Sequence, residues 1–347
     1  MSSYNFLFDT LGLRSYCDQG INPQVEKAMT MADLLAKVKG GEAEEAPWWD
    51  IDFPSLDNLH NACEAFPRTR DLTLAFENMF LEIKDLLKFF LDPLTQPLSW
   101  LLDGALYVFT GMPWGILIPL ILALVNYASK SKGVTIFVGF VMFFFAFINH
   151  YTVAIETLSI IFVCTVLCFL IGVPLGIAMS KYNKFQRGMI PVLDILQTLP
   201  TFVYLIPLIF LFSVTESKLY GIAIILYAIV PVVRLTDLGI RLVDQEVIEA
   251  ANAYGMSPKQ KLFRVEIPLA LPNIMAGINQ TIMMALAMVV IASLVSAPGL
   301  GVLVLRGIRS LELGVGLVSG ICIVLIAVML DRTSKSALAR INVTHKI

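Results

Sequence analysis

The sequence predicts an all-α polytopic membrane protein with about seven transmembrane helices. Of its 347 residues, 57% are hydrophobic and 15% are charged, and the mean hydropathy is +0.77. An average soluble domain carries about 25% charged residues, so a water-exposed globule would leave much of this apolar surface uncovered. Charge is also divided unevenly: residues 1–113 hold 17 acidic and 8 basic side chains, whereas residues 114–347 hold 10 and 17. The two regions therefore face different surroundings.

Charge-free runs predict where the chain crosses the bilayer, because a spanning helix needs about 20 mostly apolar residues. Seven such runs are Gly104–Ser129, Gly133–Ile155, Thr157–Ser180, Ile195–Thr215, Leu219–Val233, Ile274–Val295 and Leu313–Leu330. The fifth is short and needs polar residues at its ends. We expect Leu98–Thr110 to form an interfacial helix rather than an eighth span, and Pro200 with Pro207 to kink the fourth span.

The predicted parts of the chain follow from these runs. Residues 1–97 form an acidic extracytoplasmic tail, either a partly ordered extension or a docking surface for an extracytoplasmic partner. Residues 98–149 hold the interfacial helix and the first two spans, residues 150–332 the main transmembrane domain, and residues 333–347 a cytoplasmic tail. The first residues lack a basic start followed by an apolar core, so we expect no cleavable signal peptide.

Lysine and arginine in the loops predict that the N-terminus lies outside and the C-terminus inside, because cytoplasmic loops retain positive charge. In this orientation fourteen basic residues lie inside. Only Lys218, Arg306 and Arg309 lie in the outside loops after the first span.

The longest inside loop, residues 234–273, predicts two short helices at an angle. Asp244 can cap a helix over Gln245–Tyr254, which Gly255 is suited to terminate. Small side chains on this first helix would let the backbone of a partner approach closely.

The second helix of the loop has its own start signals. Ser257 can act as N-cap, Pro258 suits the first helical position, and Gln260 completes a capping box. We expect Pro268 and Pro272 to end this helix before the next span.

A family resemblance rests on these loop residues. Glu249-Ala250-Ala251, then Gly255 after three residues, then Val265-Glu266-Ile267-Pro268, resembles the EAA loop of ABC importer permeases. Three other segments, Gln197–Pro207, Gly277–Ser293 and Gly299–Gly307, look like the permease of glycine betaine/proline betaine importers. The resemblance covers roughly residues 113–332. Ala297-Pro298 replaces a pair of small glycines usual in that family, which would stiffen the outer loop.

The resemblance implies a type I ABC importer transmembrane fold in the cell inner membrane. Two copies, expected to be identical, would enclose a path, a cytoplasmic ABC ATPase dimer would power it, and an extracytoplasmic binding protein would deliver the solute. The loop 241–272 would couple to the ATPase through Glu249, Ala250, Ala251, Gly255 and Pro268. The sequence contains no GxxxxGK[ST] motif, so no catalytic residue and no cofactor are expected in this chain, and ATP and Mg would bind the ATPase.

Two ion pairs are expected near this loop. The Glu249 carboxylate would hold the loop by pairing with Lys261 or Arg264, or by accepting backbone N–H groups. Arg234 and Asp237, three residues apart on a helix, would pair with each other.

A quaternary ammonium solute suits aromatic faces, because its charge attracts the negative face of the ring. The candidate path residues are Thr198, Thr201, Phe202, Tyr204, Asn279 and Thr281. Helix packing is the competing interpretation for each of them, since Thr and Asn also bond between membrane helices.

Other functions remain open at this point. An ABC permease could import choline, carnitine, trimethylamine N-oxide or an amino acid instead. A stand-alone secondary transporter would place acidic residues at mid-depth, whereas Glu156, Asp194, Asp237 and Asp331 fall near the ends of the runs. A membrane-embedded enzyme or a metal site would need clustered His and Cys residues, which are scattered here. Nothing indicates a nucleic-acid partner.

Overall fold

The computed structural model describes residues 55–63 and 66–344, and in these ranges every regular element is a helix. Trp48, Trp49 and the rest of the tail up to residue 54 lie outside the described residues. The chain divides into two compact units, Met1–Leu86 and Leu87–Ile347. In the first unit, α4 (Leu56–Ala62) begins at an N-cap, because Asn58 N donates to Ser55 Oγ at 3.2 Å.

The helices account for the seven apolar runs. Four stretches are long and apolar enough to cross a membrane: α8 (Tyr151–Lys181), α11 (Ser217–Arg241), Pro258–Val295 and Leu313–Arg340. The third contains α14 (Ile267–Ala292), and the fourth is most of α16 (Leu313–Thr344). Two bent helix pairs raise the count to as many as six spans if each pair is one span, and the shorter apolar helix α7 (Lys132–Phe147) follows the first pair.

At two places where the sequence predicted a single span, the structure has two helices joined at a sharp bend. The first pair joins α5 (Thr69–Gly111) to α6 (Trp114–Ser129) at 113°, and the second joins α9 (Asn183–Thr198) to α10 (Thr201–Leu211) at 95°. Each break contains a proline, Pro113 and Pro200, directly before the second helix, where its fixed φ and missing N–H disfavour continuation of the first helix. Pro207 lies inside α10 without a further break.

The boundary expected at Glu156 is wrong. The chain turns at residues 148–150, where Asn149 has φ 61°, and Glu156 lies inside α8. Asn tolerates this left-handed conformation better than most residues. A charged residue ends an apolar run in the sequence, but it does not have to end the helix. Here the turn lies at Asn149, which can adopt the left-handed conformation.

The helix expected at Leu98 does not begin there, since residues 98–110 belong to α5. Its side chains have partners on α11: Leu98 and Leu102 lie so close to Gly221 that an added Cβ would be 3.2 and 2.5 Å from them. Ser217 Oγ also donates to an Asp103 carboxylate oxygen. These contacts explain why this stretch is a packed part of the second unit.

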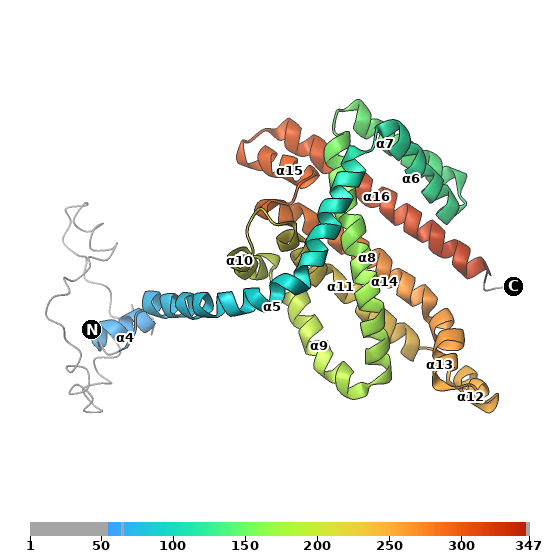
Figure 1. Cartoon of the computed structure of the whole chain (residues 1–347), viewed down its shortest axis with the longest axis horizontal. Helices are drawn as coiled ribbons and strands as arrows, with labels where there is room; N and C mark the ends of the chain where they lie inside the picture. The colour runs from blue at the N-terminus through green and yellow to red at the C-terminus, as the bar shows by residue number, and fades with distance from the viewer. Residues whose placement is uncertain (1–54, 64–65, 345–347) are drawn as a thin grey trace, which may run out of the picture. The chain divides into compact units, whose positions relative to one another are not determined.

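The core of the second unit is formed by α8, α11 and α14 (Figure 1). Glycine lets these helices approach closely. A Cβ at Gly176 of α8 would lie 2.6 Å from Thr236 Cβ, and one at Gly277 of α14 would lie 3.0 Å from Val232 Cα. Because a larger side chain at either contact would force its neighbours to move, the three helices pack tightly against one another.

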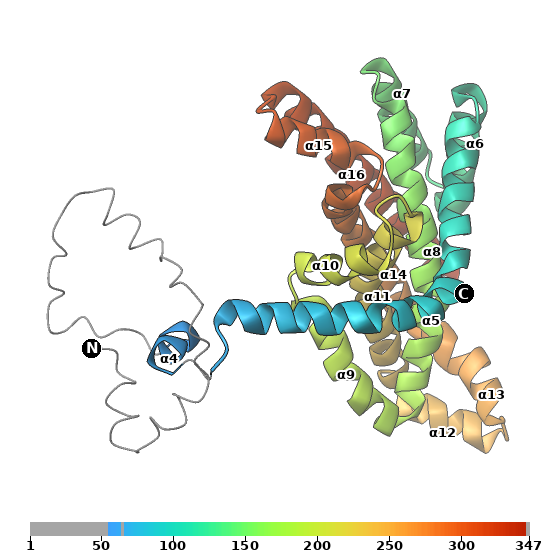
Figure 2. The same cartoon turned by 60° about the vertical axis from the view of Figure 1, so that its left-hand side comes forward.

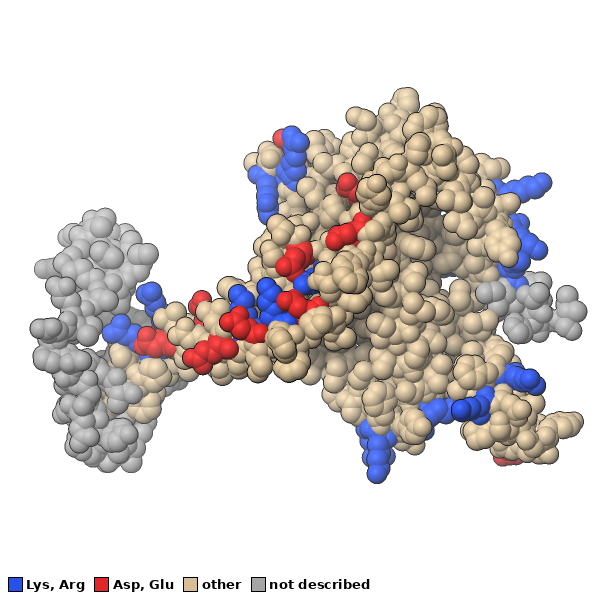
Figure 3. All heavy atoms as spheres, viewed as in Figure 1, with Lys and Arg blue, Asp and Glu red and all other residues tan. Residues whose placement is uncertain are grey.

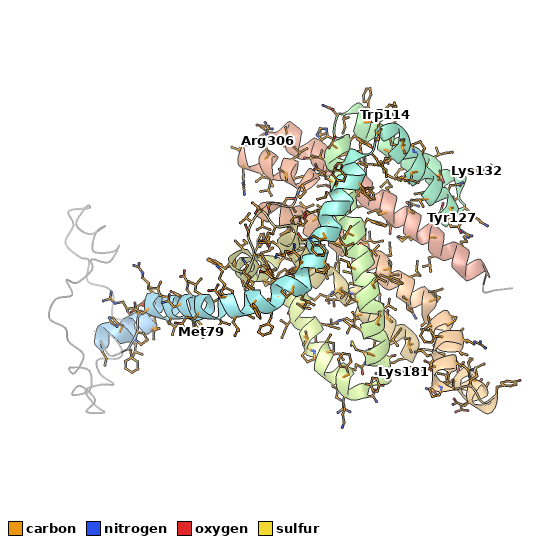
Figure 4. The ribbon with its side chains drawn as sticks, viewed as in Figure 1. Met79, Trp114, Tyr127, Lys132, Lys181 and Arg306 are labelled. Atoms are coloured by element: carbon orange, nitrogen blue, oxygen red, sulfur yellow. The ribbon has the colours of Figure 1, made fainter. Side chains whose placement is uncertain are left out.

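The two ends of this body carry different elements. Figures 1 and 2 show α12 (Gln245–Ala253) and α13 (Pro258–Lys261) at one end and α15 (Leu300–Arg309) at the opposite end. Basic side chains gather along the lower and right-hand edges in Figure 3, the edges where α9, α13 and the end of α16 lie. In Figure 4, Lys181 lies toward the α12 end and Arg306 lies on α15.

Candidate functional site

The loop after α11 folds into the two short helices that its capping residues predict. Asp244 Oδ1 accepts from Glu246 N at 3.0 Å, so α12 begins as expected, and it ends at Ala253, one residue before the predicted Tyr254. Gly255 follows with φ 73°, a conformation that glycine adopts at no steric cost.

The start of α13 is also the predicted one. Ser257 Oγ accepts from Gln260 N at 3.4 Å, and Gln260 Oε1 accepts from Ser257 N at 3.0 Å. This reciprocal pair is the capping box expected from the sequence, with Pro258 in the first turn.

The expected end of the second helix is wrong. Pro268 and Pro272 do not stop it: α13 continues through a π-helical turn, η2 (Leu262–Glu266), into α14, which contains both prolines. In η2 the Ile267 N–H reaches Leu262 O, five residues back. This wider turn lets a proline follow without the clash that its ring makes in a regular α-helix.

The surface of α12 is open and built from small side chains. Glu249 and Ala250 are exposed, whereas Ala251 is 5% exposed and faces the protein. At the end of the helix Tyr254 is 86% exposed, and Phe263 of η2 is 66% exposed. Large apolar side chains that flank a small-residue surface at the end of a membrane domain are typical of a site that a partner covers.

The ion pair expected between Glu249 and Lys261 or Arg264 is not found among the described residues. Lys261 Nζ donates to Asn252 Oδ1 at 3.0 Å, and among the residues the structure describes neither Lys261 nor Arg264 forms an ion pair with Glu249. The Lys261–Asn252 bond joins α13 to α12, so it performs the holding role that was assigned to Glu249. The Glu249 carboxylate is left facing outward from α12.

The expected Arg234–Asp237 pair is also wrong. Arg234 pairs with Asp194 of α9, and Asp237 accepts from Arg241 Nε at 2.8 Å and from Gln186 Nε2 at 2.6 Å. Both carboxylates therefore tie α9 to α11. Arg234 thus pairs with a carboxylate 40 residues away, whereas Asp237 pairs with Arg241, four residues on in the same helix, and also accepts from Gln186, 51 residues away.

Charged groups also fix both roots of the loop to α8. Arg241, the last residue of α11, donates to Met179 O at 2.8 Å. Glu266, the last residue of η2, is 2% exposed and forms an ion pair with Lys181. Sequence reasoning named Glu266 only as one letter of the loop motif, and no local spacing links it to Lys181.

The candidate path residues divide into two groups. Thr198 and Thr201 flank the break at Pro200, and Thr198 Oγ1 donates to Asp194 O of its own helix at 2.8 Å. Phe202 is 53% exposed on α10, and Tyr204 Oη donates to Met288 Sδ of α14 at 3.6 Å. Tyr204 thereby fixes α10 against α14.

Asn279 and Thr281 are held between helices. Asn279 Nδ2 donates to Asp331 Oδ1 at 3.1 Å, and Asn279 Oδ1 accepts from Ser334 Oγ at 2.5 Å, so Asn279 joins α14 to α16. Thr281 is 1% exposed, and its hydroxyl has no hydrogen-bond partner among the described residues. The contacts of Asn279 agree with the packing interpretation that competed with a path role.

One charged cluster escaped the sequence reasoning. Lys218, expected in an outside loop, is 4% exposed, and its Nζ binds Asp92 at 2.7 Å and Glu216 at 2.8 Å. The ammonium group also lies 5.1 Å from the centroid of the Phe212 ring. The cluster joins α5 to the start of α11, and the only hint in the sequence is a lysine that directly precedes an apolar run.

The helix bundle carries the two-helix loop at one end, as the sequence resemblance to importer permeases implies. Residues 169–336 match the family described as binding-protein-dependent transport system inner membrane component. The chain belongs to this family.

Three curated relatives are similar over most of the chain. The glycine betaine/proline betaine transport system permease protein ProW of Escherichia coli is 39% identical over 241 residues, which cover 69% of this chain and 67% of that protein. The glycine betaine transport system permease protein OpuAB of Bacillus subtilis is 36% identical, with 74% and 94% covered. The glycine betaine/carnitine transport permease protein GbuB of Listeria monocytogenes is 39% identical, with 71% and 88% covered.

A solved structure agrees on the fold. An inward-facing form of the MetNI methionine ABC transporter aligns with a TM-score of 0.50 at 20% identity, over 55% of this chain and 95% of that chain. By its family and relatives the chain is a multi-pass inner-membrane permease of a binding-protein-dependent transport system, and its fold is the type I fold of the MetNI ABC importer.

Proposed function

We propose that this chain forms the translocation path of an ATP-driven importer for glycine betaine, proline betaine or a related quaternary ammonium or methylamine osmolyte. The observation that carries the proposal is the loop 241–272: α12 presents exposed small residues, its ends are fixed by caps, and its roots are bonded to α8. The names of the similar ProW, OpuAB and GbuB proteins support the solute class.

Coupling would run through the exposed surface of α12. Glu249, Ala250 and Ala251 lie on α12 and Gly255 ends it, while Pro268 lies where η2 passes into α14. A groove on a cytoplasmic ATPase would accept this short helix, because alanine allows close backbone approach. When ATP draws the two ATPase subunits together, the loop would move as a rigid body and switch the helix bundle between its two open states. The chain itself would catalyse no reaction.

Charge supports the proposed orientation, and the family supports the proposed partners. The basic edges in Figure 3 would face the cytoplasm, with the N-terminus outside and the C-terminus inside. A second copy of the chain would complete the path and lipid would surround the pair. An extracytoplasmic binding protein would deliver the solute at the α15 end. The exposed aromatic Phe202, beside Thr198 and Thr201 at the break in the fourth span, would face a quaternary ammonium solute.

The proposal is tested in proteoliposomes that hold this chain with its ATPase, supplied with the binding protein and radiolabelled glycine betaine. Uptake should require ATP and should be lost without the ATPase. Unlabelled proline betaine should compete with the label. Stronger competition by choline, carnitine, trimethylamine N-oxide or an amino acid would reassign the solute, and uptake by the chain alone would reject the ATP-driven mechanism.

A further inference from the structure

The last turn of α8 is bonded to both roots of the coupling loop 241–272. At the first root, Arg241 donates to Met179 O at 2.8 Å. At the second root, Glu266 pairs with Lys181. Lys181, which is labelled in Figure 4, is the last residue of α8. The loop therefore leaves the bundle and returns to it at the same place on one helix.

Among the described residues, Lys181 is the cation that pairs with the Glu266 carboxylate. Glu266 is 2% exposed, whereas the Lys181 side chain is 36% exposed. A buried carboxylate without its cation is strongly disfavoured, so the pair stays closed when the loop is displaced. Lys181 in turn is held at the end of a continuous helix of 31 residues.

The N-terminal end of α8 is bonded to α15, at the end of the bundle opposite the coupling loop. Thr157 Oγ1 of α8 accepts from Leu300 N, the first residue of α15, at 2.9 Å. A shift of α8 along its axis would therefore reach the segment between α14 and α15. Packing of α8 on α11 through Gly176 makes such a shift a motion of the whole body.

We propose that Lys181 and Glu266 are positioning residues that convert movement of the coupling loop into movement of α8, and through α8 into movement of the α15 end. This inference rests on the proposed function, because it requires an ATPase that moves the loop. The contact that would transmit the movement is the Lys181–Glu266 ion pair, which lies outside the α12 surface that the ATPase would bind.

The test uses charge reversal in the complete transporter. Lys181→Glu, Glu266→Lys and the double reversal are reconstituted with the ATPase and the binding protein, and solute imported per ATP hydrolysed is measured. Each single variant should still bind the ATPase but lose about tenfold in this ratio, within the usual range of coupling free energies. The double reversal, which restores an ion pair, should recover most of it.

Two further variants keep the result clear. Lys184→Glu makes the same charge change at an exposed residue three positions on, which has no ion pair among the described residues, and should leave the ratio unchanged. Glu266→Gln retains an acceptor for Lys181 and should give an intermediate ratio even if a reversed single variant folds poorly.

Three outcomes would overturn the inference. Single variants that lower melting temperature and yield without changing import per ATP would give the pair a purely structural role. A double reversal no better than the single variants would show that the pairing is not what matters. Import by the unaltered chain without the ATPase would overturn the proposed function as well, and the wild-type arm separates that failure from the other two.

Discussion

Thr157 of α8 and Leu300 of α15 are joined by a hydrogen bond in which the Thr157 hydroxyl accepts from the Leu300 N–H at 2.9 Å. Both residues are fully buried, and the Thr157 hydroxyl donates in turn to Val153 O at 2.9 Å. Gly299, with φ 115°, brings the backbone this close, because a Cβ there would lie 2.3 Å from Thr157 Oγ1. A single threonine thereby fixes the segment at the opposite end from the coupling loop.

Thr157→Val should destabilise the purified chain by about 1 to 3 kcal/mol, because it leaves the buried Leu300 N–H without an acceptor. Thermal unfolding in detergent measures the change. Thr157→Ser keeps the hydroxyl and is the matched control. Equal melting temperatures for the Val and Ser variants would show that the hydrogen bond contributes nothing.

Gly176→Ala should lower stability by about 1 to 3 kcal/mol through overpacking, since its Cβ would lie 2.6 Å from both Thr236 Cβ and Val233 O. Gly188→Ala is the control. It lies in α9 with nothing within 4 Å of an added Cβ, so alanine there should be neutral or stabilise by about 0.5 to 1 kcal/mol. A stable Gly176→Ala variant would mean that α8 and α11 can separate.

Lys218→Gln should cost about 2 to 3 kcal/mol, near the lower limit for a broken buried ion pair, because its two acidic partners are each about a third exposed and can be partly hydrated. Arg306→Gln breaks the exposed pair with Glu312, whose N–O distance is 3.5 Å, and should cost about 0 to 1 kcal/mol. Thermal unfolding curves of Lys218→Gln and Arg306→Gln measure the difference between the two costs. Equal unfolding midpoints for the two variants would contradict the prediction.

Gly255→Val should impair coupling more than Gly255→Asn. An added Cβ meets nothing within 4 Å, so the cost comes from the φ of 73° alone, about 1 to 2 kcal/mol for an ordinary residue and less for Asn. Solute imported per ATP hydrolysed is the measurement, and Glu249→Gln should also lower it, because this exposed carboxylate lies on the α12 surface proposed to contact the ATPase. Retention of full coupling by both Gly255→Val and Glu249→Gln would remove these residues from the mechanism.

The local features of the coupling loop were predictable because caps depend on neighbouring residues. Asp244 and the Ser257–Gln260 pair each satisfy backbone groups within three residues, and the structure confirms both. The π-helical turn before Pro268 was not predictable in this way. It depends on how the loop returns to α14 against the rest of the bundle, which no short pattern records.

Ion pairs between residues far apart in the chain were also not predictable from local patterns. Arg234 and Asp237 have the spacing of an ion pair on one helix, yet Arg234 pairs with Asp194 of α9, and Asp237 pairs with Arg241 and accepts from Gln186 of α9. Lys181 and Glu266 are separated by 85 residues, so only the packing of α8 beside the loop brings them together. The family and the helical spans could be read from residues near one another in the chain, whereas the contacts that would transmit motion could not.

Binding of the ATPase to the purified chain tests the central claim most directly. Ala250→Trp places a large side chain on the exposed face of α12 without touching the core, so the variant should fold normally. It should bind the ATPase at least about tenfold more weakly than the unaltered chain, equivalent to about 1.4 kcal/mol. Equal affinities for the two chains would contradict the assignment of α12 as the surface that the ATPase grips.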